Sequence, residues 1–380
     1  MKIDRVHFYV EDARAWRNWF IYKLGFQAVA NSSTSHTYTE VIKHGPIYFV
    51  LSSPLTLLSP VAQFLHQHPP GVADVTFCVE DVEAVMQQAV AYGVEVLQSV
   101  QYQQDYKWAR IAAWGSLSHT LVERQDELGL GDKEGKVDLG TREHDDTKDS
   151  PFLRVSLSPF LPPVLPATPT FTGIDHIVLN VAAGDLERAV AWYENVLGFR
   201  SQQTFKIQTD RSALHSQVMV SHNSCVQFPI NQPASPTSQI QEFLNANQGP
   251  GIQHIALQTP NILQAIASLR SSDVSFLCVP TSYYAQLEKR QGLPLSVAEL
   301  EKIAQEQILV DWQGSHSDAL LLQTFTQPIF AQPTFFFEII ERRFQAAGFG
   351  EGNFRALFEA IEREQIKRGN LPEEAGGQEG

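Results

Sequence analysis

Pro250-Gly-Ile-Gln-His-Ile-Ala-Leu257 repeats, without a gap, the pattern of Pro70-Gly-Val-Ala-Asp-Val-Thr-Phe77. A segment with helical periodicity follows each stretch, at 82–92 and 262–269. A strand followed by a helix at two distant places indicates an internal repeat, and such a repeat determines the fold before any single motif does.

A second pair of similar segments begins each half of the chain. His7-Phe-Tyr-Val10 is followed by a helical segment and Leu24-Gly-Phe26, while His176-Ile-Val-Leu-Asn-Val181 is followed by a helical segment and Leu197-Gly-Phe199. Both segments of this second pair have the pattern of strand, amphipathic helix, glycine stop and strand. We therefore predict an α+β fold of four βαβββ modules, arranged as two domains of two modules each.

Between the halves the composition changes. Residues 126–149 are charged and contain glycine, and residues 158–169 contain five prolines and few helix formers. We predict an N-terminal domain at 1–135, a linker at 136–170 and a C-terminal domain at 171–380.

Composition excludes several classes of protein. A chain of 380 residues with 43% hydrophobic residues is long enough for two packed cores. The formal net charge of −14 disfavours nucleic acid as a partner. The start of the chain lacks a signal-peptide pattern and no apolar run is long enough to span a membrane, so we expect a soluble cytoplasmic protein. Cys78, Cys225 and Cys278 are widely spaced, and we expect them to be buried and free.

Two histidines and one glutamate form a candidate metal site. His176 and His254 lie at matching points of two repeats, each early in a predicted strand, and Glu338 interrupts the apolar run Pro333-Thr-Phe-Phe-Phe-Glu-Ile-Ile340. A buried glutamate is costly unless it is paired or bound to a metal. Two imidazoles and a carboxylate can hold Fe(II) and leave coordination positions open. On spacing alone, structural histidines and a salt-bridged glutamate are an equally open interpretation.

The spacing of apolar residues in the C-terminal region predicts one amphipathic helix. Phe354, Leu357, Phe358 and Ile361 have helical spacing behind an N-cap at Asn353. We expect this helix, from 353 to about 364, to cover a site as a lid.

Several ordered segments resemble the 4-hydroxyphenylpyruvate dioxygenase family of the vicinal-oxygen-chelate superfamily. The resemblance is strongest over 171–365, in Ile174-Asp-His-Ile-Val-Leu-Asn180, Pro229-Ile-Asn231, Gly249-Pro-Gly-Ile-Gln-His-Ile-Ala-Leu257, Leu321-Leu-Gln-Thr-Phe325, Phe337-Glu-Ile-Ile340 and Gly348-Phe-Gly-Glu-Gly-Asn-Phe354. It implies two glyoxalase-like barrel domains, of which the N-terminal one lacks a metal. It also implies an Fe(II)-dependent homodimer that converts 4-hydroxyphenylpyruvate and O2 to homogentisate and CO2, in tyrosine catabolism or in quinone and tocopherol synthesis.

The resemblance assigns roles to individual residues. It makes His176, His254 and Glu338 the iron ligands. It implies substrate contacts by Ser216, Asn231, Gln239, Gln253, Gln323, Phe325, Phe349, Asn353 and Phe354, of which Gln239, Gln253, Gln323 and Phe325 also act in catalysis. His215 departs from the family pattern, in which Asn or Arg precedes the serine, and we do not expect it to bind metal.

Alternative functions remain open on the sequence. 4-Hydroxymandelate synthase resembles the same family and uses the same substrate and ligands. Ring-cleaving dioxygenases, glyoxalase-type lyases and a non-catalytic module that binds a small aromatic molecule are more distant alternatives. The repeat also places His7, Asp74 and Glu123 at roughly the positions that correspond to the three candidate ligands, so a second metal site in the N-terminal half is conceivable.

Overall fold

The computed structural model describes residues 1–124, 170–209, 212–290, 292–312 and 319–369, and within them two eight-stranded sheets form the framework. The first has the strand order β2-β3-β4-β1-β5-β8-β7-β6. Its strands are β1 (Lys2–Tyr9), β2 (Gln27–Ser33), β3 (Thr37–His44), β4 (Ile47–Pro54), β5 (Gly71–Cys78), β6 (Val96–Tyr102), β7 (Tyr106–Ala112) and β8 (Ser118–Arg124).

The second sheet repeats this topology strand for strand, in the order β10-β11-β12-β9-β13-β16-β15-β14. Its strands are β9 (Gly173–Asn180), β10 (Arg200–Gln208), β11 (Ala213–Val220), β12 (Gln227–Pro233), β13 (Gly251–Gln258), β14 (Leu309–Trp312), β15 (Leu320–Phe325) and β16 (Phe336–Arg343). The central strands of each sheet, β1 with β5 and β9 with β13, pair antiparallel and join two modules.

Each module has one helix after its first strand. These are α1 (Ala13–Leu24), α3 (Val82–Ala91), α4 (Leu186–Leu197) and α6 (Ile262–Ser271). Gly25 and Gly198 end α1 and α4 with φ of 72° and 67°, a left-handed conformation that glycine adopts at little cost. Additional helices are α2 (Pro60–Gln67), α5 (Gln239–Asn247), α7 (Thr281–Leu287), α8 (Val297–Gln305) and α9 (Phe354–Lys367), and a 3-10 turn at Glu351–Asn353 precedes α9.

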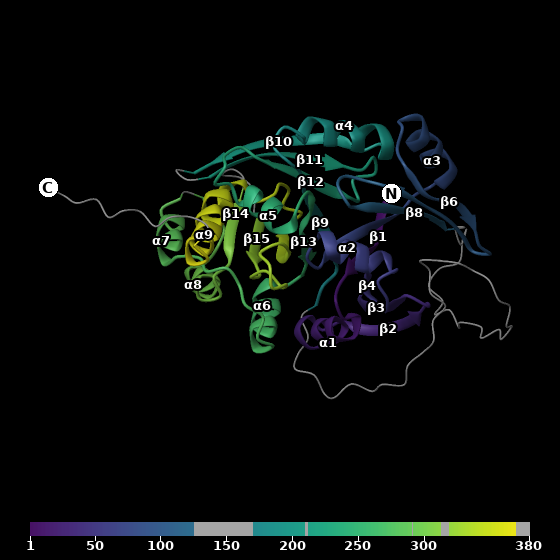
Figure 1. The fold of residues 1–380 in the computed structure, drawn as a ribbon. Coiled ribbons are helices and arrows are strands. Elements are labelled where there is room, and N and C mark those ends of the chain that lie inside the picture. Colours follow the sequence, from purple (N-terminus) through teal and green to yellow (C-terminus); the bar gives the residue numbers. More distant parts are fainter. Residues whose placement is uncertain (125–169, 210–211, 291, 313–318, 370–380) are drawn as a thin grey trace, which may run out of the picture.

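The two halves lie side by side and share one core (Figure 1). Phe8 and Phe49 of the N-terminal half pack against Phe335 and Phe337, with ring centroids 5.2 and 6.0 Å apart. The first module therefore contacts the fourth, and α3 of the second module contacts α4 of the third. Phe337 and Glu338 are neighbours on β16 and face opposite sides of the sheet. The N-terminal half therefore packs against the face of β16 opposite the candidate ligand.

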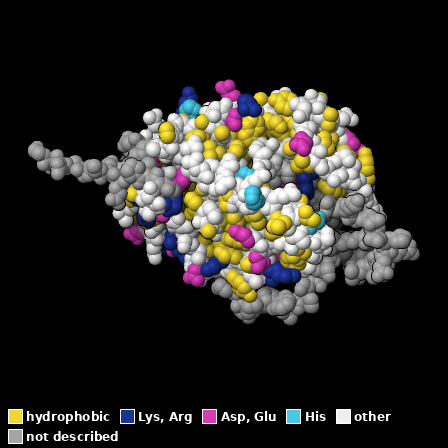
Figure 2. Space-filling model, viewed as in Figure 1, with side chains coloured by type: hydrophobic (Ala, Val, Ile, Leu, Met, Phe, Trp, Pro, Cys, Tyr) yellow, Lys and Arg dark blue, Asp and Glu magenta, His cyan; other side chains and the backbone are white. Residues whose placement is uncertain are grey.

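The structure confirms the predicted α+β fold of four βαβββ modules and the helices expected in each of them. The linker prediction falls on residues that the structure does not describe, apart from Thr170, and the domain limits stay a prediction. None of the described helices is long and apolar enough to cross a membrane. On the face shown in Figure 2, side chains of both charges are dispersed among apolar ones.

The expectation of buried cysteines is wrong. Cys225 and Cys278 are exposed and Cys78 is half-buried, and all three are free thiols. Cys225 follows a turn at Ser224 and Cys278 precedes α7, so neither lies in a regular element that faces the core.

Candidate metal centre

Three neighbouring strands bring the candidate ligands together. In the register of the sheet, Ala256 on β13 lies between His176 on β9 and Glu338 on β16. His254 lies two residues before Ala256 on the same strand, and residues two apart on a strand face the same side. The repeat thus places all three side chains on one face of adjacent strands.

The distances fit a shared metal ion. Nε2 of His176 lies 3.1 Å from Oε2 of Glu338, and Nε2 of His254 lies 3.6 Å from the same oxygen. The three ligand atoms all lie within 4.8 Å of one another. Ligands bound at roughly 2.1 Å and at right angles to one another would be about 3 Å apart. Glu338 is only 3% exposed, so its carboxylate needs a positive partner at this depth.

Hydrogen bonds from the adjacent residues orient both imidazoles. His176 Nδ1 donates to Oδ1 of Asp175 at 2.8 Å, and His254 Nδ1 donates to Oε1 of Gln253 at 3.2 Å. When Nδ1 carries the proton, Nε2 presents its lone pair to the centre of the cluster. Both rings are therefore set in the tautomer that a metal requires.

The electrostatics of the two histidines differ. Burial alone would lower the pKa of His176, but the carboxylates of Glu338 and Asp175 outweigh burial and raise this pKa to about 9. Burial, and then the charge on His176, lower the pKa of His254 well below its ordinary value. A metal ion binding here would displace the proton that His176 holds below this pKa.

A cavity opens over the three ligands and contains most of the predicted contact residues. Eight of the nine predicted substrate contacts line it: Ser216, Asn231, Gln239, Gln253, Gln323, Phe325, Phe349 and Phe354. The side-chain oxygens of Gln239 and Gln323 are buried without a hydrogen-bond partner. Buried polar atoms are normally paired, so these two amides are suited to bind a polar ligand.

Asn353 is the predicted contact that the structure does not bring to the cavity wall. Its Oδ1 accepts a hydrogen bond of 2.7 Å from the Tyr283 hydroxyl, and Asn353 is completely buried. Asn353 does precede α9, but its side chain makes no capping hydrogen bond. His215 is also absent from the cavity wall, because it neighbours Ser216 on β11 and alternate residues of a strand face opposite sides.

Several aromatic walls were missed from the sequence. The Phe336 ring stacks on His254 with centroids 4.8 Å apart, and the Phe205 ring meets Phe354 at 5.1 Å. Phe336 precedes Glu338 by two residues on one strand, so the two-residue period of a strand was a usable signal. From α9, Phe358 and Ile361 complete the apolar wall, which agrees with the predicted covering helix.

The N-terminal half has different residues at the equivalent positions, and the suggested set of His7, Asp74 and Glu123 is wrong in two of three places. Strand register aligns Arg5 with His176, Asp74 with His254 and Thr120 with Glu338. Glu123 instead accepts a hydrogen bond from the Val82 backbone and pairs with Lys107. The error arose because His7 lies two residues beyond the position that matches His176.

Comparisons with known proteins agree with the site. The Glyoxalase/Bleomycin resistance protein/Dioxygenase superfamily matches residues 173–289. The chain is 38% identical to the 4-hydroxyphenylpyruvate dioxygenase of Coccidioides posadasii, over 97% of this chain and 94% of that one. It is 33% identical to an uncharacterised protein of Synechocystis, over 95% and 97% of the two chains. A mutant of 4-hydroxymandelate synthase from Streptomyces coelicolor has a similar structure, with a TM-score of 0.79 and 27% identity, over 96% and 98% of the two chains.

Proposed function

The chain belongs to the 4-hydroxyphenylpyruvate dioxygenase family, and on this premise we propose that it converts 4-hydroxyphenylpyruvate and O2 to homogentisate and CO2 with Fe(II) as its metal. The observation that carries the proposal is the His176, His254 and Glu338 cluster at the base of a cavity with aromatic walls. Two imidazoles and one carboxylate are the ligand set of non-haem Fe(II) oxygenases. Bound there, Fe(II) would supply the oxidising chemistry with O2.

The cavity suits an aromatic 2-oxo acid. Neither lysine nor arginine is among its described lining residues, so the substrate carboxylate would find its counter-charge at the metal end. Phe325 and Phe336 line that end and offer apolar surface to a ring. A substrate held with its acid group near the ligands would therefore place its ring against these phenylalanines.

Polar side chains would orient the phenol and the 2-oxo acid. The unpaired oxygens of Gln239 and Gln323 can accept a hydrogen bond from a hydroxyl group. Ser216 and Asn231 face each other across β11 and β12 on the same cavity wall. We assign catalytic positioning to Gln239, Gln253, Gln323 and Phe325, and substrate binding to Ser216, Asn231, Phe349 and Phe354. We no longer include Asn353, which we instead assign to anchoring α9 through Tyr283.

Helix α9 would keep water from the reacting atoms. Phe354, Phe358 and Ile361 close one side of the cavity, and α9 packs against α5 and β10. Exclusion of water protects reactive species from side reactions. The homodimer and the cytoplasmic location stay predictions.

4-Hydroxymandelate synthase activity is the second candidate, favoured by the similarity of fold to that enzyme over nearly the full length of both chains. That reaction would hydroxylate the side chain of the same substrate and leave the ring intact. A substrate ring lying against Phe325 and Phe336 at the metal end would have its own carbons within reach of the oxidising centre, and the higher identity to dioxygenases also supports the first candidate.

The test is reconstitution with Fe(II) without oxygen, followed by 4-hydroxyphenylpyruvate and O2, with the product identified by chromatography and mass. We expect homogentisate, and no product from Glu338→Ala. Hydroxymandelate would establish the second candidate. Bound iron without either product would refute both, and a protein that binds no iron would refute the ligand assignment itself.

A further inference from the structure

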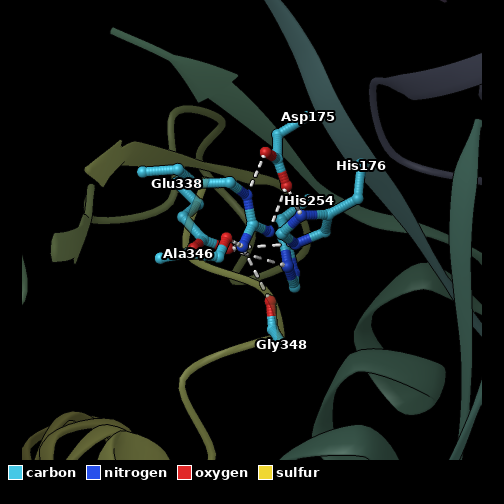
Figure 3. Close-up of polar contacts among 7 residues, drawn as sticks. Asp175, His176, His254, Glu338, Ala346 and Gly348 are labelled. Atoms are coloured by element: carbon cyan, nitrogen blue, oxygen red, sulfur yellow. Dashed lines mark hydrogen bonds and ion pairs between the residues drawn. The ribbon is translucent and has the colours of Figure 1, made fainter. Parts of the chain in front are cut away.

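Arg342 connects the metal centre to the segment that leads into α9. Its Nε and Nη2 donate to the two carboxylate oxygens of Asp175 at 2.6 and 2.8 Å. Its Nη1 donates to the backbone carbonyls of Ala346 and Gly348 at 3.0 and 2.9 Å. Figure 3 shows that Asp175 and these two carbonyls meet the same guanidinium group. One side chain therefore contacts two parts of the molecule that are far apart in sequence.

The first end of this connection reaches a metal ligand. Oδ1 of Asp175 accepts hydrogen bonds both from Arg342 and from His176 Nδ1. The Asp175 side chain is 5% exposed and that of Arg342 is 11% exposed, so water competes little for these bonds. A carboxylate held at two points by a planar guanidinium has a fixed orientation. The orientation of the His176 ring consequently depends on Arg342 through Asp175.

The second end reaches a segment with an unusual backbone. Phe344, Gln345, Gly348 and Gly350 all have positive φ, between 49° and 83°. Non-glycine residues adopt this conformation at a cost and keep it only where surrounding contacts hold it. The bonds from Arg342 to residues 346 and 348 are contacts of this kind. They fix the path of the chain just before Phe349 and α9.

Phe349 provides a second contact between the metal centre and the segment that precedes α9. Its ring lies edge-on to His176 with centroids 5.3 Å apart, and it also lines the cavity. A shift of segment 344–350 would therefore move a ring that contacts a metal ligand. The metal centre and the covering helix are joined both through Arg342 and through Phe349.

We propose that Asp175 and Arg342 are positioning residues that couple metal binding to closure of the helix over the cavity. The proposal rests on the metal site of the proposed function. A metal that fixes His176 fixes Asp175 and, through Arg342, the carbonyls of Ala346 and Gly348. By linkage, a closed helix increases metal affinity by the same factor that metal increases closure.

The N-terminal half supplies a matched control. Arg124, the equivalent of Arg342 in strand register, pairs with Asp4 at 2.6 Å. Asp4 also pairs with Arg5, which occupies the position of His176. The aspartate–arginine pair is thus present in both halves, but only in the C-terminal half does its aspartate hold a histidine of the metal cluster. A change at Arg124 disturbs the pair without disturbing that histidine.

The experiment is hydrogen exchange of the full chain, followed by mass spectrometry of peptides from 346–367, with and without saturating Co(II). In the wild type we expect Co(II) to slow exchange there at least tenfold. Arg342→Lys keeps the positive charge but loses the two-point hydrogen bonding of the guanidinium. In this variant we expect Co(II) affinity to fall 10- to 100-fold. We also expect the slowing of exchange by saturating Co(II) to fall below twofold. Asp175→Asn tests the same Asp175–Arg342 pair from the side of His176, and we expect the same two losses. Arg124→Lys should keep both wild-type values.

The outcomes separate the two proposals. Wild-type protein that binds no Co(II) would overturn the metal site and the coupling together. Bound Co(II) without slowing in the wild type would overturn the coupling alone. The coupling is also overturned if Arg342→Lys and Asp175→Asn retain the full metal-dependent slowing, or if Arg124→Lys loses it, because the effect would then reflect general stability.

Discussion

The two halves of the molecule have the same topology but differ in whether their equivalent polar side chains are hydrogen-bonded within the protein. In the N-terminal half, Asp74 accepts hydrogen bonds from Thr76, Ser118 and Thr120 at 2.7 to 2.9 Å. At the equivalent place in the C-terminal half, His254 and Glu338 face each other across 3.6 Å, and the Gln323 oxygen nearby has no partner. The first arrangement is complete in itself, and the second is completed by a ligand.

The difference extends to the wall of the site. Register aligns Thr39 with Ser216 and Ser52 with Asn231. The Thr39 and Ser52 hydroxyls bond to each other at 2.7 Å, and Ser52 also bonds to His7 at 2.8 Å. A repeated fold can therefore become a structural unit when short hydroxyl side chains satisfy one another, and a binding unit when longer amides are left unpaired.

The largest expected effect contrasts Glu338 with its equivalent. Glu338→Ala should reduce metal affinity by more than about 100-fold and turnover by more than about 1000-fold, because it removes one of three ligands. Thr120→Ala in the N-terminal half should leave both unchanged and cost about 1 kcal/mol of stability. Calorimetric metal titration and turnover assays check both variants. Equal losses in the two variants would contradict the division of roles.

A second prediction concerns His119, which occupies the position of Phe337 and is completely buried between the halves. Burial lowers the pKa of His119 to about 4, although Asp74 and the Val75 carbonyl oppose this shift. The neutral ring is stabilised by folding, so its contribution is complete above pH 6.5 and is lost as the pH falls towards 4. The full loss is roughly 3 kcal/mol.

Urea unfolding at several pH values measures this loss. His119→Phe, which copies the C-terminal half, should be less stable at neutral pH because Tyr193 loses its 3.0 Å hydrogen bond. Its stability should nevertheless fall less steeply than that of the wild type between pH 6.5 and 4. Parallel curves for the two proteins would show that His119 does not titrate as stated.

A third prediction concerns Gly350, which has a φ of 76° and packs against Gln323. A Cβ there would lie 2.3 Å from the Gln323 side-chain oxygen. Gly350→Ala should displace the start of α9 and reduce turnover about 10- to 100-fold. Gly369→Ala is the control, because Gly369 has a φ of 75° and nothing within 4 Å of an added Cβ. Turnover assays that give equal losses would attribute the effect to backbone strain instead of to the contact with Gln323.

The smallest expected effect separates Ser216 from Thr39. Ser216→Ala should raise KM about two- to tenfold, the amount expected for one neutral hydrogen bond to the substrate. Thr39→Val should destabilise the protein by about 1 kcal/mol and leave KM unchanged, because Thr39 bonds to Ser52 and not to a ligand. Steady-state kinetics and thermal unfolding distinguish the two results, and a raised KM in Thr39→Val would oppose the comparison.

The sequence predicted the architecture well because the repeated segments contain recognisable helix ends and matching strands. Gly25 and Gly198 ended the helices where expected, and matching strands placed His176 and His254 in one sheet. The alternation of side chains along a strand was a weaker guide to which residues of the two halves are equivalent. Without the neighbouring strand, the sequence could not show that His7 lies two positions from the equivalent of His176.

Contacts between distant segments were out of reach of the sequence. Asp175 and Arg342 are 167 positions apart, and their pairing depends on β9 and β16 flanking β13. Asn353 was assigned to the substrate on resemblance, but the Tyr283 hydroxyl that holds it comes from α7, a helix we did not predict. Such roles depend on inserted segments whose positions no local pattern specifies.

The aromatic packing between the halves limits how this chain can change over evolutionary time. Phe8 and Phe49 cover Phe335 and Phe337 behind the strand that carries Glu338. Substitutions at the N-terminal positions that match the candidate ligands would leave these rings covered. The N-terminal half as a whole cannot be removed, because its loss would expose that row of rings to water. The N-terminal half is therefore a permanent part of the scaffold that supports the strand of Glu338.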